Sequence, residues 1–254
     1  MKRLLTLAVA GLITSCTPIA PVTQSNAETL NKKWELVSIE GNEVITSMPV
    51  YLDLGTTNRV TGYAGCNTIN GNYMVKNGTQ INFSQVASTR MMCAPYDMNI
   101  EREVLDILKT ADNFTINNGQ LMLNVGRRAP LAVFTEMSKD PALNRFWKIT
   151  ELNGKKVMMK VNQEKEQGFM LRSGGKITGF AGCNTFMGNY TLSGKNTIKF
   201  DNNMAMTMKA CPDTNVNEQE FVNIFKKANN YQVKDNTLIL KGSDNKVFAV
   251  FEAM

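Results

Sequence analysis

The sequence predicts an α+β chain, mainly β, made of two similar small domains in tandem. Residues 62–68 recur 117 residues later as residues 179–185, with the single change of Tyr63 to Phe180. Each repeat contains short alternating segments separated by Gly and Asn clusters, which are typical of strands. Each also contains one segment with the apolar spacing of an amphipathic helix. A period of this length fits a whole domain better than a solenoid unit.

Residues 1–16 have the features of a bacterial lipoprotein signal. Lys2 and Arg3 precede an apolar run over residues 4–13, and small residues then lead to Cys16. The run is too short to span a bilayer, so we expect an export signal that is removed. Cys16 would then be the first mature residue and would carry the lipid. A plain secretory signal followed by an incidental cysteine is the alternative.

Residues 17–30 are expected to form a flexible tether, because they are mostly polar and include two prolines. Several acyl chains on Cys16 would hold the protein stably on a membrane. Thr17 is not the aspartate that typically retains enterobacterial lipoproteins in the inner membrane, which favours the outer membrane. The tether lacks the acidic run that marks surface export in some Gram-negative groups, so we expect the protein to face the periplasm.

The first repeat, residues 31–137, is predicted to contain eight short strands. In the first of these, Trp34, Leu36 and Ser38 alternate with residues of the opposite face. Asn77-Gly78 is a dipeptide that supplies the positive φ of a tight hairpin. The expected strands are residues 34–39, 50–54, 59–64, 71–75, 79–83, 114–116, 121–123 and 132–134.

A single amphipathic helix interrupts these strands. Its apolar positions in the first repeat are Ile100, Val104, Ile107, Leu108 and Ala111, and the second repeat matches this pattern with Phe221, Ile224, Phe225 and Ala228. A helix with one apolar stripe must bury that stripe, and the only available cover is the sheet. The sheet is therefore expected to curl around the helix.

The second repeat is predicted to span residues 144–254, after a linker at residues 138–143 that contains Pro141. Trp147 repeats Trp34 at a shift of 113 residues, and Cys211 repeats Cys93 at a shift of 118. Length changes therefore fall in loops, and each repeat is expected to fold as a separate domain.

Composition excludes several classes of function. The chain contains no histidine, which rules out Ser-His-Asp and Cys-His catalysis, histidine zinc sites and histidine proton relays. Removing the two cations of the signal from the net charge of +6 leaves +4. No run of Lys or Arg exceeds two residues, so nucleic-acid binding is not expected.

A family resemblance rests on short motifs in fixed order, each seen twice. The first repeat shows Gly-Cys-Asn-Thr at 65–68, Gly-Asn-Tyr at 71–73, Thr-x-Met-Met-Cys-x-Pro at 89–95, and Glu101 before an apolar helix. This resembles the META domain, the family of HslJ-like heat-shock lipoproteins, over residues 31–137 and 144–254. In the second repeat Lys209 stands where the family usually shows Met.

The resemblance implies a small half-open antiparallel β-barrel wrapped on one helix, similar to type III secretion pilot lipoproteins. It also implies a link to envelope stress. It brings no catalytic, cofactor-binding or metal-binding residues, because none is established for the family.

Four cysteines remain after lipidation: Cys66, Cys93, Cys183 and Cys211. Equivalent placement and an oxidising compartment favour the pairs Cys66–Cys93 and Cys183–Cys211. Loops of 27 and 28 residues would close, each contributing roughly 3.5 kcal/mol. Free buried thiols and a redox or metal role remain alternatives, although there is no Cys-x-x-Cys motif.

The other candidate residues have structural and functional interpretations. Gly65, Asn67, Gly182 and Asn184 could form a ligand loop, but a β-bulge or barrel corner needs the same residue types. Glu101 and Glu218 could be catalytic acids, yet a carboxylate in the first turn of a helix is favoured by the helix dipole alone.

Methionine supplies one further candidate. The alternating residues Met204, Met206 and Met208 could bind Cu(I) from one face of a strand, although core packing is the favoured interpretation.

The sequence thus predicts a non-enzymatic outer-membrane lipoprotein that acts as a binding or envelope-stress module. Its partners would be the membrane, through Cys16, and an unidentified envelope protein or hydrophobic ligand. A carrier or sensor that holds a hydrophobic ligand in the barrel mouth is the main alternative. An enzyme that acts on cell-wall material is a third, and it lacks a recognisable catalytic set.

Overall fold

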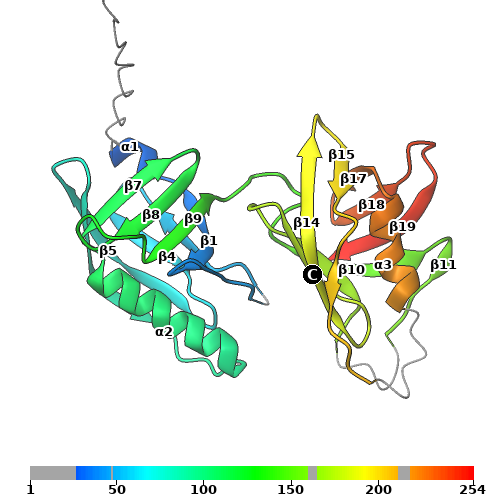
Figure 1. The fold of residues 1–254 in the computed structure, drawn as a ribbon, viewed down its shortest axis with the longest axis horizontal. Helices are drawn as coiled ribbons and strands as arrows, with labels where there is room; N and C mark the ends of the chain where they lie inside the picture. Colours follow the sequence, from blue (N-terminus) through cyan, green and yellow to red (C-terminus); the bar gives the residue numbers. More distant parts are fainter. Residues whose placement is uncertain (1–26, 47, 160–164, 211–217) are drawn as a thin grey trace, which may run out of the picture.

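The structure is a computed structural model that describes residues 27–46, 48–159, 165–210 and 218–254. Figure 1 shows two units side by side, each a curled sheet with a helix against it. The first domain runs from α1 to β9 and the second from β10 to β19. Two separate clusters of buried side chains, one in each unit, form their cores.

The first domain is a half-open barrel. Its sheet runs in the order β2-β1-β3-β4-β5-β6-β7-β8-β9, and antiparallel pairing of β1 with β9 closes it. Strands β6 and β7 share only the pair Gln80↔Asn113, and α2 (Pro95–Thr110) connects them. The other elements are α1 (Ala27–Leu30), β1 (Lys33–Ile39), β2 (Asn42–Glu43), β3 (Tyr51–Leu54), β4 (Arg59–Tyr63), β5 (Thr68–Lys76), β6 (Gln80–Ser88), β7 (Asn113–Asn117), β8 (Gln120–Asn124) and β9 (Ala132–Glu136).

The second domain repeats this topology. Pairing of β10 with β19 closes it, and the weak junction is the single pair Thr197↔Asn230 between β15 and β17. Helix α3 (Glu218–Lys227) takes the place of α2. The strands are β10 (Phe146–Leu152), β11 (Lys155–Lys156), β12 (Gly168–Leu171), β13 (Lys176–Phe180), β14 (Thr185–Ser193), β15 (Thr197–Phe200), β16 (Ala205–Met206), β17 (Asn230–Lys234), β18 (Thr237–Lys241) and β19 (Val247–Ala253). The predicted fold class, two tandem half-open barrels, is confirmed.

The predicted helix stripes are buried in both domains. All five apolar positions in the first repeat and all four in the second are at most 7% exposed. The second core is more aromatic, since Phe169, Phe186 and Phe225 stand where the first repeat has Leu52, Ile69 and Leu108. Ring pairs such as Phe169–Phe225, with centroids 5.1 Å apart and nearly perpendicular planes, add to the packing there. The interiors are therefore filled by side chains.

Strand β1 differs from its prediction. Trp34 and Leu36 are buried, but Ile39 replaces Ser38 on the inner face. The cause is a β-bulge between Leu36 and Ser38 in the pairing with β9, which shifts the alternation by one residue. The predicted turn at Asn77-Gly78 does have positive φ at both residues, 51° and 77°.

The predicted tether and linker extend too far into the domains. Residues 27–30 form helix α1, and Leu30 is fully buried in the first core. Its carbonyl accepts a hydrogen bond from Nε1 of Trp34 at 2.9 Å. Ala142, assigned to the linker, is also fully buried, and its carbonyl accepts the equivalent bond from Trp147 at 2.7 Å. Each Trp indole therefore fixes the segment that enters its own domain.

Candidate functional site

The Gly-Cys-Asn motif of the first domain ties a loop to helix α2. Asn67 Oδ1 accepts hydrogen bonds from Thr89 Oγ1 at 2.8 Å and from the backbone N–H of Met91 at 2.6 Å. Its Nδ2 donates to Glu101 Oε2 at 2.9 Å. Gly65 has φ +130° and passes so close to α2 that a Cβ would lie 2.7 Å from the carbonyl oxygen of Asp97. These contacts connect the β4–β5 turn, the loop after β6 and the helix.

The second domain contains the same polar network. Asn184 Oδ1 accepts bonds from Thr207 Oγ1 and the N–H of Lys209, while its Nδ2 donates to Glu218 Oε2 at 2.8 Å. Glu218 Oε1 also accepts the backbone N–H groups of Cys183 and Asn184, at 2.8 and 2.6 Å. Gly182 has φ +124°, as its counterpart does. The network thus repeats, and its members bond to one another and to the backbone.

Glu101 has a different role from the one predicted. Helix α2 begins at Pro95, so Glu101 lies in its second turn, and the first-turn acid is Asp97. The helix dipole therefore does not account for Glu101, whose carboxylate is held by Asn67. Glu218 does lie in the first turn of α3 as described. Sequence reasoning overlooked the repeated polar trio because Thr89 and Thr207 bond to the motif only after folding brings them close.

Cys66 and Cys93 form a disulfide with a Cα–Cα distance of 5.7 Å. It links the same turn and loop that Asn67 connects. Cys183 is also disulfide-bonded, whereas its predicted partner Cys211 lies outside the described residues. The lipidation candidate Cys16 also lies outside them.

A buried ion pair joins the two domains. Glu35 and Arg172, 137 residues apart, are bonded through Glu35 Oε1 and Arg172 Nε, and their side chains are only 2% and 6% exposed. Glu35 Oε2 also accepts the N–H of Ser173 at 2.8 Å, and Arg172 donates to the carbonyl oxygen of Thr46 at 3.4 Å. Trp34 and Leu36 point into the first core, so Glu35 points out of it and is covered by the second domain.

Tyr190 and a surface ion pair support this contact. The Tyr190 hydroxyl donates to the carbonyl oxygen of Arg172 at 2.7 Å, and burial raises the pKa of that hydroxyl. Lys176 pairs with Glu43 across the same interface at 2.9 Å, in an exposed position. The repeat positions of Glu35 and Arg172 hold Lys148 and Gly55. This departure from the repeat was the sequence signal for an interface, and it was missed.

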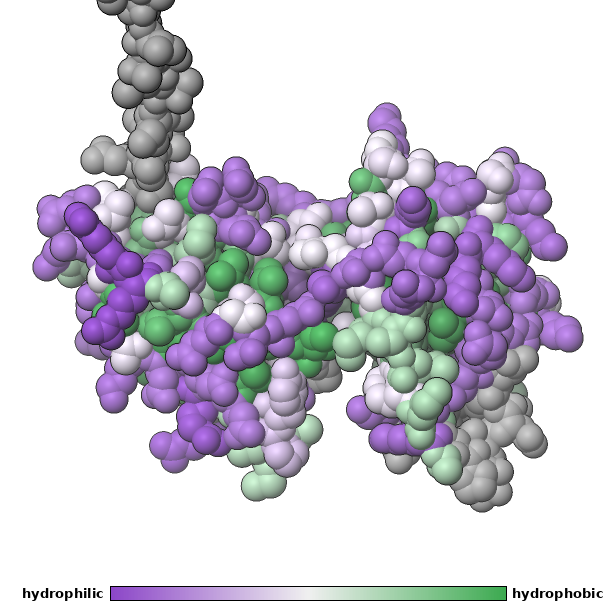
Figure 2. All heavy atoms as spheres, viewed as in Figure 1, coloured by the Kyte–Doolittle hydropathy of each residue, from purple (hydrophilic) through white to green (hydrophobic). Residues whose placement is uncertain are grey.

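A cavity of about 580 Å³ lies between the domains. Ile45 and Tyr96 belong to its first-domain wall, and Met170, Phe180 and Met187 belong to its second-domain wall. All four residues of β12 are buried, although only one face of a strand meets its own core. In Figure 2 hydrophobic residues gather where the two units meet, flanked by hydrophilic ones. We call this cavity the interdomain groove.

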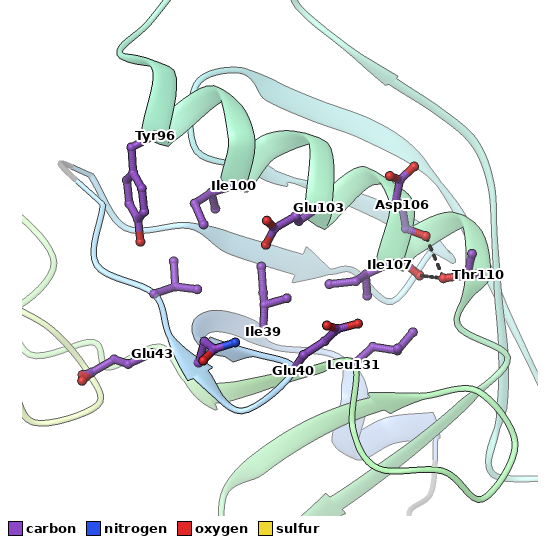
Figure 3. Close-up of a pocket in the computed structure, with 12 residues that line it drawn as sticks. Ile39, Glu40, Glu43, Tyr96, Ile100, Glu103, Asp106, Ile107, Thr110 and Leu131 are labelled. Atoms are coloured by element: carbon purple, nitrogen blue, oxygen red, sulfur yellow. Dashed lines mark hydrogen bonds between the residues drawn. The ribbon is translucent and has the colours of Figure 1, made fainter.

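A second cavity, of about 570 Å³, lies in the first domain between α2 and the β1–β2 hairpin (Figure 3). Ile39, Ile100 and Ile107 lie in its lining, together with the carboxylates of Glu40 and Glu103. We call it the helix–hairpin groove. Tyr96 and Glu43 line both cavities, so the two grooves are neighbours.

The methionines are more exposed than predicted. Met204 packs against the second core, but Met206 is 36% exposed and Met208 is 97% exposed. Core packing is therefore wrong for the latter two residues. Strand β16 contains only Ala205 and Met206, so the alternation that would place all three on one covered face does not persist.

Within the described ranges, no three or more Cys, Asp or Glu side chains are grouped so that they could hold a metal ion. None of the helices in the described part of the chain has both the length and the apolar character needed to cross a membrane.

Comparison with known proteins identifies the repeat unit. The family model described as the META domain matches residues 27–138 and again residues 141–254. No curated protein shows significant similarity to the chain.

Three solved structures are similar to parts of the chain. An NMR structure of a protein from Burkholderia xenovorans is 22% identical and covers 52% of this chain and 99% of its own, with a TM-score of 0.39. A second NMR structure is 23% identical and covers 42% and 90%, with a TM-score of 0.36. A crystal structure of a DUF4847 family protein from Bacteroides vulgatus is 19% identical and covers 45% and 95%, with a TM-score of 0.33.

Proposed function

Because the chain belongs to the META domain family and carries two copies of the domain, we propose that it is a non-enzymatic binding module of the bacterial cell envelope. Its lipid anchor would be Cys16, which follows the export signal at the start of the sequence. It would face the periplasm from the outer membrane and act under envelope stress. The interdomain groove would be its binding surface.

The observation that carries this proposal is the apolar cavity shared by both domains. Its lining combines Phe146, Met170, Phe180 and Met187 with Tyr96 from the other domain. Aromatic residues and methionine are enriched in protein interfaces, whose cores are depleted of charged residues and whose rims are polar. Glu43 and Lys165 are exposed polar lining residues here. The occupant that fits best is therefore an apolar segment of an envelope protein.

The repeated polar network supports a non-enzymatic role. Asn67 and Asn184 use their amide groups to connect a loop, a threonine and a helix glutamate within each domain. Fully bonded networks of this kind rigidify a fold and specify one packing. The network thus explains the repeated Gly-Cys-Asn motif as a structural feature, without a catalytic role.

Site-specific photocrosslinking in cells tests the binding surface. A photoreactive amino acid would replace Met187, which is 39% exposed and lines the groove. The matched control is Met74, which is 53% exposed and lies on β5 outside the interdomain groove. We expect one envelope protein to be captured from Met187 and not from Met74. Adding Ile45→Asp on the opposite wall should abolish that capture.

Two outcomes would contradict the proposal. Equal capture from both positions would show that the groove is not the binding surface. Crosslinking to lipid alone would instead support the carrier of a hydrophobic ligand. In that case the ligand would lie between the domains and not in a barrel mouth.

Replacing Cys16 by serine tests the anchor separately. The variant should move from the membrane fraction to the soluble periplasmic fraction, because no acyl chain can be attached. Retention of Cys16→Ser in the membrane fraction, together with an unlipidated amino terminus in intact-mass analysis of the unmodified chain, would show that the anchor is wrong.

A further inference from the structure

The helix–hairpin groove of the first domain combines an apolar floor with acidic walls. Ile39, Val44, Ile100, Ile107 and Leu131 are its aliphatic lining residues. Its acidic lining residues are Glu40 and Glu43 from the hairpin side and Glu103 and Asp106 from α2. In Figure 3 the side chain of Glu103 points toward the hairpin that carries Glu40, whereas the carboxylate of Asp106 points away from the hairpin. Within the described part of the chain, only Glu43 among these four has an ion-pair partner, Lys176.

The described part of the corresponding site in the second domain is smaller. Its cavity is only about 220 Å³. Asn153, which replaces Glu40, donates to Glu220 Oε1 at 2.8 Å and so bridges the helix and the hairpin. Phe248 stands in place of Leu131 and lines the smaller cavity. The described residues thus line a wide groove in the first copy and a narrower one in the second, where the counterpart of Tyr96 lies outside the described residues.

The charge of the site is also reversed between the copies. Six polar lining positions of the first groove hold four carboxylates, Asn42 and Thr110. The corresponding six positions in the second repeat hold three lysines and a single carboxylate. The lysines are Lys155, Lys156 and Lys227. A cationic ligand is therefore complementary to the first groove and is repelled by the second.

The length of the groove indicates an extended ligand. Its lining on α2 runs from Tyr96 to Thr110, which corresponds to about 21 Å of helix at 1.5 Å per residue. An extended peptide of about six residues spans that length. A small organic cation would reach only part of the carboxylates. A metal ion does not fit, because no three carboxylates of the described residues are grouped to hold one.

We propose that the helix–hairpin groove binds a short, extended peptide in which basic and apolar residues alternate. Lysine or arginine side chains pair with Glu40 and Glu103, and the apolar side chains rest on Ile39 and Ile107. This site is separate from the interdomain groove and does not depend on the function proposed for that groove.

Binding of a defined probe to the purified full chain tests the proposal. The probe is a fluorescent synthetic peptide of alternating lysine and leucine of that length, followed by anisotropy at low and at physiological ionic strength. The double variant Glu40→Gln/Glu103→Gln should lower the affinity by about tenfold or more, because hydrogen bonds to charged groups are lost. Both residues are exposed, so the fold should be retained, and circular dichroism checks this.

One control variant tests whether affinity depends only on the net charge of the protein. A second variant tests whether binding needs the open volume of the groove. Asp235→Asn/Glu252→Gln removes the same charge from exposed positions of the second domain and should leave the affinity unchanged. Leu131→Phe introduces the residue of the second repeat, keeps every charge, and should weaken binding by filling the groove.

Three results would overturn the proposal. The first is an equal loss of affinity in both charge variants, which would mean that only net charge matters. The second is unchanged binding in Glu40→Gln/Glu103→Gln. The third is equal affinity for a probe with serine in place of leucine, because the apolar floor would then play no part.

Discussion

Replacing Glu35 by alanine should uncouple the two domains without unfolding either one. Glu35 lies on the outer side of β1, so its loss leaves the first core intact. The substitution does remove both carboxylate oxygens that hold the turn after β12. One accepts a hydrogen bond from Arg172 and the other accepts the N–H of Ser173. Arg172 would keep only the 3.4 Å bond to the carbonyl oxygen of Thr46 among these interdomain contacts.

The size of the effect follows from the burial of the pair. Removing one partner of a buried ion pair costs about 3–5 kcal/mol, because an uncompensated charge stays buried. Here the molecule can avoid that cost by opening the interface, which returns Arg172 to water. The loss in free energy of unfolding is therefore limited to the free energy that couples the two domains. The structural consequence should be separation of the domains.

Calorimetry and small-angle scattering on the same samples measure this. The unmodified chain should unfold in one transition, whereas Glu35→Ala should show two transitions and a larger radius of gyration. The matched control is Glu43→Ala, which removes the exposed pair with Lys176 across the same interface and should cost under about 1 kcal/mol. If Glu35→Ala behaved like Glu43→Ala in both measurements, the reasoning would be refuted.

The remaining predictions concern single domains. Glu218→Ala should lower the free energy of unfolding by about 1.5–3 kcal/mol, and Glu101→Ala by less, because Glu218 accepts three hydrogen bonds and Glu101 accepts one; equal losses in urea titrations would contradict this. Replacing Cys66 and Cys93 by serine should destabilise the first domain by roughly 3.5 kcal/mol, and an unchanged melting temperature would contradict that value. Burial and a hydrogen bond to Asp140 raise the pKa of Tyr231 from 10.0 to about 12. Its contribution to stability should therefore be present below pH 10 and lost as the pH rises to about 12; a Tyr231→Phe variant with the same alkaline profile would contradict this.

The repeat and the helix spacing predicted two domains, each with a sheet curled around one helix, and the META resemblance implied the half-open barrel. Val104, Ile107 and their copies Phe221 and Ile224 lie at helical spacing, and burial of that stripe requires a sheet that curls around it. The β1 register was wrong at Ser38 because a bulge is set by the partner strand β9, which is distant in sequence. The domain edges were wrong because Leu30 and Ala142 lie outside the repeated strand and helix patterns, and only the fold shows that they are buried and bonded to a tryptophan indole.

The candidate surfaces were less predictable than the fold. Residues that repeat, such as Asn67 and Asn184, proved to connect elements within each domain. The surfaces that could bind a partner depend on residues that differ between the copies. Glu35 pairs with Arg172 across the interface, and neither position has an equivalent charge in the other repeat.

The central claim is that the two META domains form one rigid unit with a shared groove. Residual dipolar couplings of backbone amides in both domains, measured on one weakly aligned sample, test it most directly. We predict that a single alignment tensor fits both domains in the arrangement held by Glu35 and Arg172. Two different tensors would mean that the domains move independently, which would contradict the interdomain groove as a preformed binding surface.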